Sequence, residues 1–257
     1  MIFESHAHYD DAAFDEDRDI LLGSFAEKGI GYVVNVAASL DTVKTTQALM
    51  KRWDFVYGAL GVHPSETGEL NEENFAWLQA QMKTPKTVAI GEIGLDYYWD
   101  KEEEVRVRQK RWFARQLALA REEKLPVIIH SRDAAKDTWD VMEAERAKEL
   151  KGVVHCFAYT KETARDFLGW DYYFGIGGVV TFKNARKLKE AVEYIPLDRI
   201  VLETDSPYLA PEPYRGKRNS SLHLPCVVRA IAQIKGIEET EVEEVTCRNA
   251  KQLFGLL

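Results

Sequence analysis

Histidines and carboxylates stand at the ends of several short apolar segments of this chain, where they could act together on a metal ion. Five of the six histidines and two acidic residues are placed this way. Side chains from separate strands meet at such ends only if the strands form one parallel sheet or barrel. A meeting of imidazole and carboxylate groups predicts a divalent-metal site, with two ions. The candidate ligands and reactive groups are His6, His8, His63, Glu92, His130, His155 and Asp205.

Each of these residues has a simpler explanation when it is taken alone. A single histidine such as His130 is more often a hydrogen-bonded core residue, and a single carboxylate is more often a buried ion-pair partner. The joint placement of four histidines and two carboxylates favours the metal site. His6 and His8 are two residues apart, so a strand directs both to the same side. Alternation turns Cys156 away from His155, and we interpret it as a small buried cysteine.

Apolar segments alternate with charged, amphipathic segments along the chain. This pattern is typical of βα units in a parallel sheet that is covered on both sides. Eight such units fit a closed (β/α)8 TIM barrel of the α/β class better than an open sheet. We therefore predict one domain over residues 1–257 with a C-terminal closing helix over 238–254. The predicted strands lie at 2–8, 31–37, 55–62, 87–95, 126–130, 152–157, 172–178 and 199–204.

The composition is that of an ordinary soluble globular protein, with 46% apolar and 30% charged residues. The net charge of −8 argues against broad, non-specific binding of duplex nucleic acid. Cys156, Cys226 and Cys247 are too scattered for a disulfide framework, which favours a reducing compartment. We see neither a signal-peptide pattern nor an apolar run of about 20 residues, so we expect a cytoplasmic protein without a membrane span.

A basic cluster follows the eighth predicted strand, where barrels of this kind usually bind phosphate. Arg215, Lys217 and Arg218 lie there in a loop rich in proline and glycine. Arginine can fork onto phosphate oxygens and lysine adds a point charge, so we predict substrate contacts, although a solvated loop would have the same composition.

Two more candidate substrate contacts follow other predicted strands. Arg132 comes two residues after His130, and Tyr97 opens a Tyr–Tyr–Trp run after the Glu92 strand. The aromatic run could stack on exposed bases or pack against a neighbouring loop. A nicotinamide enzyme is disfavoured, because no Gly-x-Gly-x-x-Gly fingerprint is present.

Seven segments give the chain a specific resemblance to a known family. They are SHAH near the start, GVHP, GEIGLDYY, LPVIIHSRDA, GVVHCF, GGVVTFKNA and ETDSPYLAPEPYRGKRN. With these segments the chain resembles the TatD family of metal-dependent nucleases, which are (β/α)8 barrels of the amidohydrolase superfamily. The resemblance implies that the metal ligands are His6, His8, Glu92, His130, His155 and Asp205, with Glu92 bridging two ions. It also implies a monomer that is active with magnesium or manganese.

The departures from the family pattern are local. Glu4 stands where the family commonly has aspartate, AYT replaces a small polar-glycine turn after HCF, and SSLHL follows RGKRN. These changes concern substrate preference rather than metal binding. Imidazole and carboxylate ligands also suit zinc, so the metal stays open among Mg, Mn and Zn.

The ligand set predicts a hydrolytic mechanism. Two ions about 3.5–4 Å apart can share a bridging hydroxide and polarise a phosphoryl or carbonyl oxygen. Four neutral imidazoles and two carboxylates leave two dications net positive, which suits a phosphodiester. Asp205 could accept the proton of the attacking water. We assign His63 to the scissile phosphate or leaving group, although a structural role in the GVHP turn is the alternative.

Three functions from different classes follow from this site. The first is a metal-dependent deoxyribonuclease, a 3′-to-5′ exonuclease acting on single strands or 3′ ends of DNA. The second is a metallohydrolase of carboxylic esters or amides, such as an aminoacyl-tRNA deacylase or a small-molecule amidohydrolase. The third is a non-catalytic scaffold, which the intact ligand set disfavours because a scaffold needs no such ligands.

Overall fold

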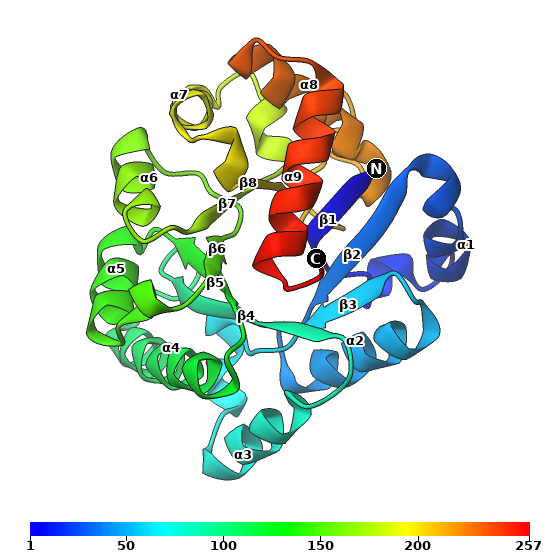
Figure 1. Ribbon diagram of the computed structural model, residues 1–257. Coiled ribbons are helices and arrows are strands. Elements are labelled where there is room, and N and C mark those ends of the chain that lie inside the picture. Colours follow the sequence, from blue (N-terminus) through cyan, green and yellow to red (C-terminus); the bar gives the residue numbers. More distant parts are fainter. The chain divides into compact units, whose positions relative to one another are not determined.

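The strands of the structure alternate with helices from one end of the chain to the other (Figure 1). A computed structural model describes residues 1–257. Its eight parallel strands have the same order in the sheet as in the sequence. The fold is a (β/α)8 TIM barrel, which confirms the predicted class. The strands are β1 (Ile2–Ala7), β2 (Ile30–Val36), β3 (Val56–Ala59), β4 (Thr87–Asp96), β5 (Val127–Arg132), β6 (Gly152–Val154), β7 (Tyr173–Ile176) and β8 (Ile200–Leu202).

Local sequence signals mark the beginning of some of the helices. Ser39 caps α2 by accepting a hydrogen bond from the Thr42 N–H, and two glutamates, Glu103 and Glu104, open α4, where the helix dipole favours negative charge. The predicted closing helix is α9. No helix combines the length and the apolar character that crossing a membrane requires. The helices are α1 (Arg18–Gly23), α2 (Leu40–Arg52), α3 (Glu72–Gln81), α4 (Glu103–Glu123), α5 (Ala135–Ala144), α6 (Lys161–Leu168), α7 (Arg186–Tyr194), α8 (Leu224–Lys235) and α9 (Glu239–Leu253).

Six of the eight strands end earlier than the apolar pattern predicts, and β6 and β8 bear on the site. The segment 199–204 was expected to be extended, yet β8 ends at Leu202. Asp205 has a φ of 57°, and Cys156, after β6, has a φ of 45°. Both values lie outside the extended region, so the chain turns there instead of continuing the strand. The candidate ligands next to these turns therefore lie on short loops.

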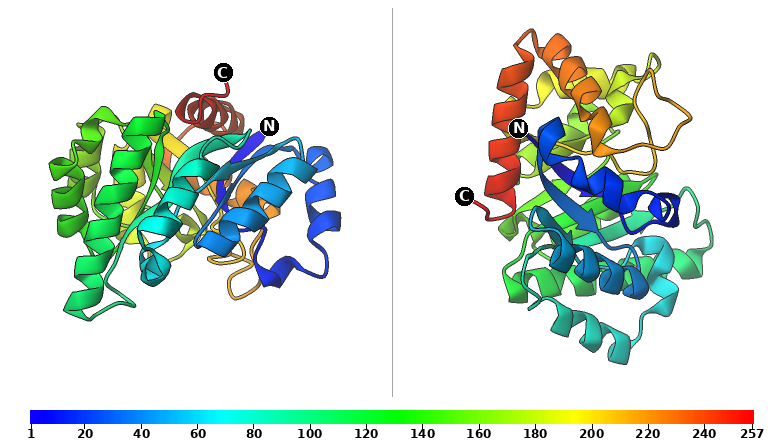
Figure 2. Two further views of the ribbon diagram at one scale, coloured as in Figure 1. Left: turned by 90° about the horizontal axis from the view of Figure 1, so that it is seen from below. Right: turned by 90° about the vertical axis from the view of Figure 1, so that its right-hand side faces the viewer.

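The chain forms two compact units, of which the first comprises Met1–Asn35 and His155–Leu257. Here β1 pairs with β2, and β7 pairs with β8. Helix α9 packs on β1 and β8, and Asn249 donates hydrogen bonds to the carbonyls of Leu197 and Ile200. Both views in Figure 2 show the N-terminus beside this helix, which is red. The helix therefore covers the strand that carries His6.

The second unit comprises Val36–Val154 and contains β3 to β6 with α2 to α5. In the β4–β5 pair, Gly94 lies opposite His130 and Asp96 lies opposite Arg132. A Cβ atom at position 94 would come within 1.9 Å of the His130 carbonyl oxygen, and the φ of Gly94 is 148°. Only glycine fits that approach. The division into units leaves the one-domain interpretation of residues 1–257 a prediction.

Candidate metal site

Five side chains gather in the first unit, in two overlapping groups that could hold a cation. One group is His6, His155 and Glu203, and the other is His6, His8 and Asp205. Within each group the ligand atoms lie within 4.8 Å of one another. We call these five residues the first cluster.

His6 on β1, His8 directly after β1 and Asp205 converge in the first cluster because two backbone hydrogen bonds join their segments. The Asp205 N–H donates to the His6 carbonyl at 2.9 Å, and the His8 N–H donates to the Ser206 carbonyl at 2.8 Å. His6 Nε2 then lies 3.2 Å from His8 Nε2, and the Asp205 Oδ1 atom is 3.3 Å from His8 Nε2. Burial would raise the pKa of Asp205, but the hydrogen bond with His8 and the nearby imidazoles lower it below the usual range.

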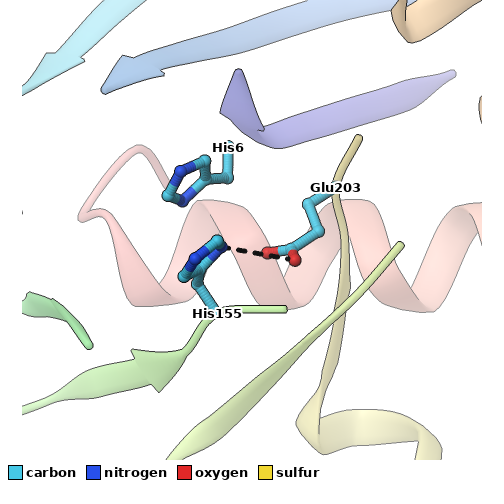
Figure 3. A group of neighbouring side chains, drawn as sticks. All are labelled: His6, His155 and Glu203. Atoms are coloured by element: carbon cyan, nitrogen blue, oxygen red, sulfur yellow. Dashed lines mark ion pairs between the residues drawn. The ribbon is translucent and has the colours of Figure 1, made fainter. Parts of the chain in front are cut away.

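The group of His6, His155 and Glu203 is more deeply buried than the group that contains Asp205. The His6 and His155 rings stack with centroids 3.9 Å apart, and His155 Nδ1 is 3.5 Å from Glu203 Oε1 (Figure 3). The relative exposure of His6 and Glu203 is only 1% each. Glu203 Oε2 is buried and accepts no hydrogen bond. Such an oxygen is costly unless a cation or donor compensates it, so the group fits a divalent metal.

Glu203 is a site residue that the sequence interpretation missed. It was assigned to the last strand, although it stands two residues before Asp205 in the Glu–Thr–Asp run. The Cys156 N–H holds Glu203 Oε1 at 2.6 Å. A Cβ atom on Gly175 would come within 2.0 Å of Glu203 Oε2, so glycine at that position leaves room for the carboxylate. Cys156 itself belongs to neither candidate group.

A buried network behind β1 supports the first cluster. Glu4 Oε1 accepts the N–H groups of His6 and Thr204, while Glu4 Oε2 pairs with the hydroxyls of Thr204 and Ser221. The Ser221 hydroxyl also pairs with that of Tyr9 at 2.7 Å. Burial raises the pKa of Glu4 to about 8, and the hydrogen bonds offset it only in part. This network ties the histidine strand to the segment that carries Asp205.

A second cluster lies in the second unit, where His63, Glu92 and His130 form one more candidate group. His130 Nδ1 is 2.5 Å from Glu92 Oε1, and His63 Nε2 is 3.8 Å from the same oxygen. Glu92 is buried, whereas the two imidazoles are half-buried. Because the ligand atoms are an imidazole–carboxylate set of the kind that binds divalent transition metals, this group also fits a cation.

Asp96 completes the second cluster and was also missed. Its Oδ2 atom lies 3.1 Å from His130 Nε2, and its Oδ1 atom accepts the N–H groups of Tyr98 and Trp99. Burial would raise the pKa of Asp96, but the hydrogen bonds from His130 and the Trp99 N–H hold it below the usual range. The Gln109 side chain on α4 pairs with the Asp96 backbone. The only signal in the sequence was the aspartate of GEIGLDYY.

The six predicted ligands all fall within these groups, and His63 falls with them. His6, His8, His155 and Asp205 belong to the first cluster, and Glu92 and His130 to the second. The predicted bridging role of Glu92 stays a prediction.

Three of the predicted substrate-binding side chains contact other residues of the protein. Arg218 forms a two-pronged ion pair with Asp17, and the Arg215 guanidinium lies 4.4 Å from the centroid of the Phe182 ring. Lys217 is exposed in the same loop. The Tyr97 hydroxyl donates to Asp137 at 2.8 Å.

Arg132, the remaining predicted substrate contact, lies against exposed aromatic rings that follow β4. Its guanidinium lies 4.1 Å from the centroid of the Tyr98 ring. Of the aromatic run, Tyr98 and Trp99 are therefore the exposed members, whereas Tyr97 is held by Asp137.

Comparison with known proteins connects this site to a family. A family model described as "TatD related DNase" matches residues 3–255. The chain belongs to the TatD family. Among its relatives is the "uncharacterized metal-dependent hydrolase YabD" of Bacillus subtilis (strain 168), which is 39% identical over 254 residues, 99% of each chain. The chain is accordingly a metal-dependent hydrolase.

Two further TatD relatives bear on the fold and the reaction. A protein of Cronobacter sakazakii named "3′-5′ ssDNA/RNA exonuclease TatD" is 32% identical over 98% of this chain and 97% of its own. The crystal structure of YJJV, a TatD homologue from Escherichia coli K12, superposes with a TM-score of 0.91 at 27% identity. That match covers 99% of this chain and 98% of the other. The TatD barrel therefore extends over nearly the whole sequence.

Proposed function

We propose that this TatD-family hydrolase cleaves phosphodiester bonds of DNA and removes nucleotides from single strands or 3′ ends in the 3′-to-5′ direction. The observation that carries the proposal is the gathering of imidazole and carboxylate ligands into the two clusters. The name of the Cronobacter relative supports the direction and the single-stranded substrate. The monomeric state and cytoplasmic location expected from the sequence stay predictions.

Two divalent ions are proposed, with Mg, Mn and Zn as candidates. In the first cluster His6, His8, His155 and Asp205 would hold one, with Glu203 beside them. In the second cluster Glu92 and His130 would hold the other. Bound there, such ions lower the pKa of water and stabilise the charge that develops on a phosphoryl oxygen.

The hydrogen bond from Ser65 fixes the proton of His63. The Ser65 N–H donates to His63 Nδ1 at 3.2 Å, so the neutral ring carries its proton on Nε2. An Nε2–H group is a donor and does not ligate a metal. We therefore assign His63 to donate a hydrogen bond to the scissile phosphate or the leaving oxygen, and we leave metal binding to Glu92 and His130.

Asp205 is the proposed proton acceptor. Its lowered pKa keeps it ionised at neutral pH, and its Oδ1 atom lies 3.3 Å from His8 Nε2. A carboxylate held this close to an imidazole can take a proton from water and share it with that ring. Glu92 is proposed to take part by holding His130 at the reacting centre.

The structure places more carboxylates in the clusters than the sequence led us to expect, and this changes the expected net charge around the ions. With Glu203 and Asp96 included, the two clusters contain four carboxylates rather than two. In each cluster two carboxylates then balance one dication, so neither ion alone leaves a net positive charge in its cluster. Attraction for a phosphodiester must come from side chains, for which Arg132, Arg215, Lys217 and Arg218 are proposed.

A gel time course tests the proposal. Metal-loaded protein would be incubated with a single-stranded DNA that is labelled at its 5′ end, with Asp205→Ala protein as the control for contaminating nucleases. A ladder that shortens by single nucleotides, and that is absent with the variant, is the expected result. An uncut strand in the presence of bound metal would contradict the proposal and favour hydrolysis of carboxylic esters or amides.

A further inference from the structure

An exposed corner of two aromatic rings and one guanidinium follows β4 and β5. The rings of Tyr98 and Trp99 meet edge to face, with centroids 4.7 Å apart and planes at 85°. The Arg132 guanidinium lies 4.1 Å from the Tyr98 centroid and 5.6 Å from the Trp99 centroid. Tyr98 is 45% exposed and Trp99 is 67% exposed. We call these three residues the aromatic corner.

The aromatic corner is attached directly to the second cluster. One oxygen of Asp96 pairs with His130 Nε2, and the other accepts the N–H groups of Tyr98 and Trp99. Arg132 is on the same strand as His130 and two residues beyond it, so the two side chains leave β5 on the same side. The corner is thus fixed next to a residue that we propose to bind metal.

Packing does not account for the exposure of the two rings. Tyr97, the first residue of the same run, is packed against its neighbours, in contrast to the two residues that follow. Its hydroxyl is bound by Asp137 and its ring is covered by the Arg106 guanidinium at 4.3 Å. The next two rings are turned outward because Asp96 holds their backbone N–H groups. Large exposed aromatic surface beside a functional site is typical of a ligand-binding surface.

We infer that the aromatic corner is the subsite for one unpaired nucleobase of the substrate strand. This inference rests on the proposed function and adds the residues that select single strands. The Arg132 guanidinium covers the Tyr98 ring on one side, and Arg132 is itself exposed, so its other face can stack on a base while Trp99 forms a wall. Aromatic rings and arginine planes bind bases by stacking regardless of sequence.

The corner also explains a preference for single strands. A base in a duplex has both faces covered by its neighbours, so it cannot enter the corner without unstacking. A base at a free or frayed 3′ end has an open face. The inference therefore predicts that the corner contributes to binding of single strands and contributes nothing to binding of abasic strands.

A binding experiment without catalysis tests the corner directly. The protein would be titrated, in the presence of a chelator, into a single-stranded oligonucleotide with 2-aminopurine near its 3′ end, because stacking quenches this base. We expect quenching with the wild-type protein, and about tenfold weaker binding for Trp99→Ala and Arg132→Lys. Tyr194→Ala is the matched control, since Tyr194 is an exposed aromatic residue on α7, outside the corner. Arg132→Lys keeps the charge and removes the planar face.

A kinetic experiment separates this inference from the proposed function. KM would be measured for a normal strand and for one with abasic 3′ residues. We expect Trp99→Ala to raise KM about tenfold for the normal strand only, with kcat little changed. If the wild-type protein cleaves DNA and neither substitution alters quenching or KM, the corner is not a base subsite while the proposed function stands. Quenching that is lost in the variants, in a protein that cuts no DNA, would support the subsite and overturn the exonuclease proposal.

Discussion

The first and second clusters use the same kinds of ligand in different surroundings. In the first, three of the five residues (His6, His155 and Glu203) are at most 5% exposed, while His8 and Asp205 are half-buried, and the buried network of Glu4 lies behind β1. In the second, the imidazoles of His63 and His130 are half-buried, and Asp96 leads directly to the exposed aromatic corner. The first is therefore suited to holding a cation rigidly, and the second to holding a cation while meeting the substrate.

Because of this difference, effects of a substitution on metal affinity can be separated from its effects on substrate affinity. A substitution in the surroundings of the first cluster should change metal affinity and stability and leave substrate affinity alone. A substitution in the surroundings of the second should change both metal affinity and KM.

The largest effect is expected from Glu92→Ala. Glu92 pairs with His130 Nδ1 and is buried, so its loss removes a proposed ligand and one of the two carboxylates that hold the His130 ring. We expect bound metal to fall and kcat to drop by more than the 10- to 100-fold that is typical of changes in the outer shell of a metal site. Metal content after dialysis and initial rates on single-stranded DNA would measure both. Full turnover with an unchanged metal content would remove Glu92 from the site.

A smaller effect is expected from a matched pair, Glu203→Gln and Asp96→Asn. Both replace a buried carboxylate beside a histidine by its amide, so both should weaken metal binding by about 10- to 100-fold. Only Asp96→Asn should also raise KM for single strands, because Asp96 positions the aromatic corner. Metal titrations and KM values at saturating metal would separate the two. Equal changes in KM for both variants would contradict the comparison between the clusters.

The features that could be predicted from the sequence are those with local signals. The alternation of apolar and charged segments is set within each βα unit, so the barrel could be predicted from the chain alone. His6 and His8 are two residues apart at the end of β1, a spacing that directs both to one side of an extended chain. His155 and Asp205 follow β6 and β8, at the end of the strands where a parallel barrel builds its site, whereas Glu92 lies within β4.

What the sequence could not show depends on contacts between residues far apart in the chain. Glu203 counts as a site residue because Gly175 leaves room for its carboxylate and Cys156 donates to it. Arg218 pairs with Asp17, 201 residues away in the sequence. No local pattern contains such pairings. The predicted substrate contact of Tyr97 stays a prediction: its hydroxyl donates to Asp137, whereas the next two aromatic side chains are exposed.

The Glu4 network makes the stability of the first cluster fall as pH rises, whereas the lowered pKa of Asp96 makes the stability of the second cluster fall only as pH drops into the acid range. The pKa of Glu4 is raised to about 8 from 4.5 in the unfolded chain, so the folded state keeps an extra proton between these values. The stabilisation that comes from the protonated Glu4 carboxyl is therefore complete below pH 4.5 and is lost as pH rises through 8. Glu4→Gln should remove this slope, because an amide does not titrate.

The free energy of unfolding measures the Glu4 effect. Urea titrations of metal-free protein would be compared at pH 5.5 and pH 8.5. We expect the wild-type value to fall by roughly 1–3 kcal/mol more than that of Glu4→Gln. Parallel changes in the two proteins would show that the Glu4 carboxyl ionises normally and that its hydrogen bonds outweigh its burial.

The smallest effect is expected from Arg218→Ala, and it concerns the loop of the first unit that was predicted to bind phosphate. The Arg218 ion pair with Asp17 is partly exposed, so its loss should lower the free energy of unfolding by only about 0.5–1 kcal/mol, and less at high salt. Arg215→Ala provides the comparison, because Arg215 has an aromatic ring beneath it and is exposed. If Arg215 contacts the phosphate, KM rises a few-fold in that variant with stability unchanged. A rise in KM confined to Arg218→Ala would instead mean that the substrate displaces Asp17, and the first unit would then contribute to substrate binding as well as to metal binding.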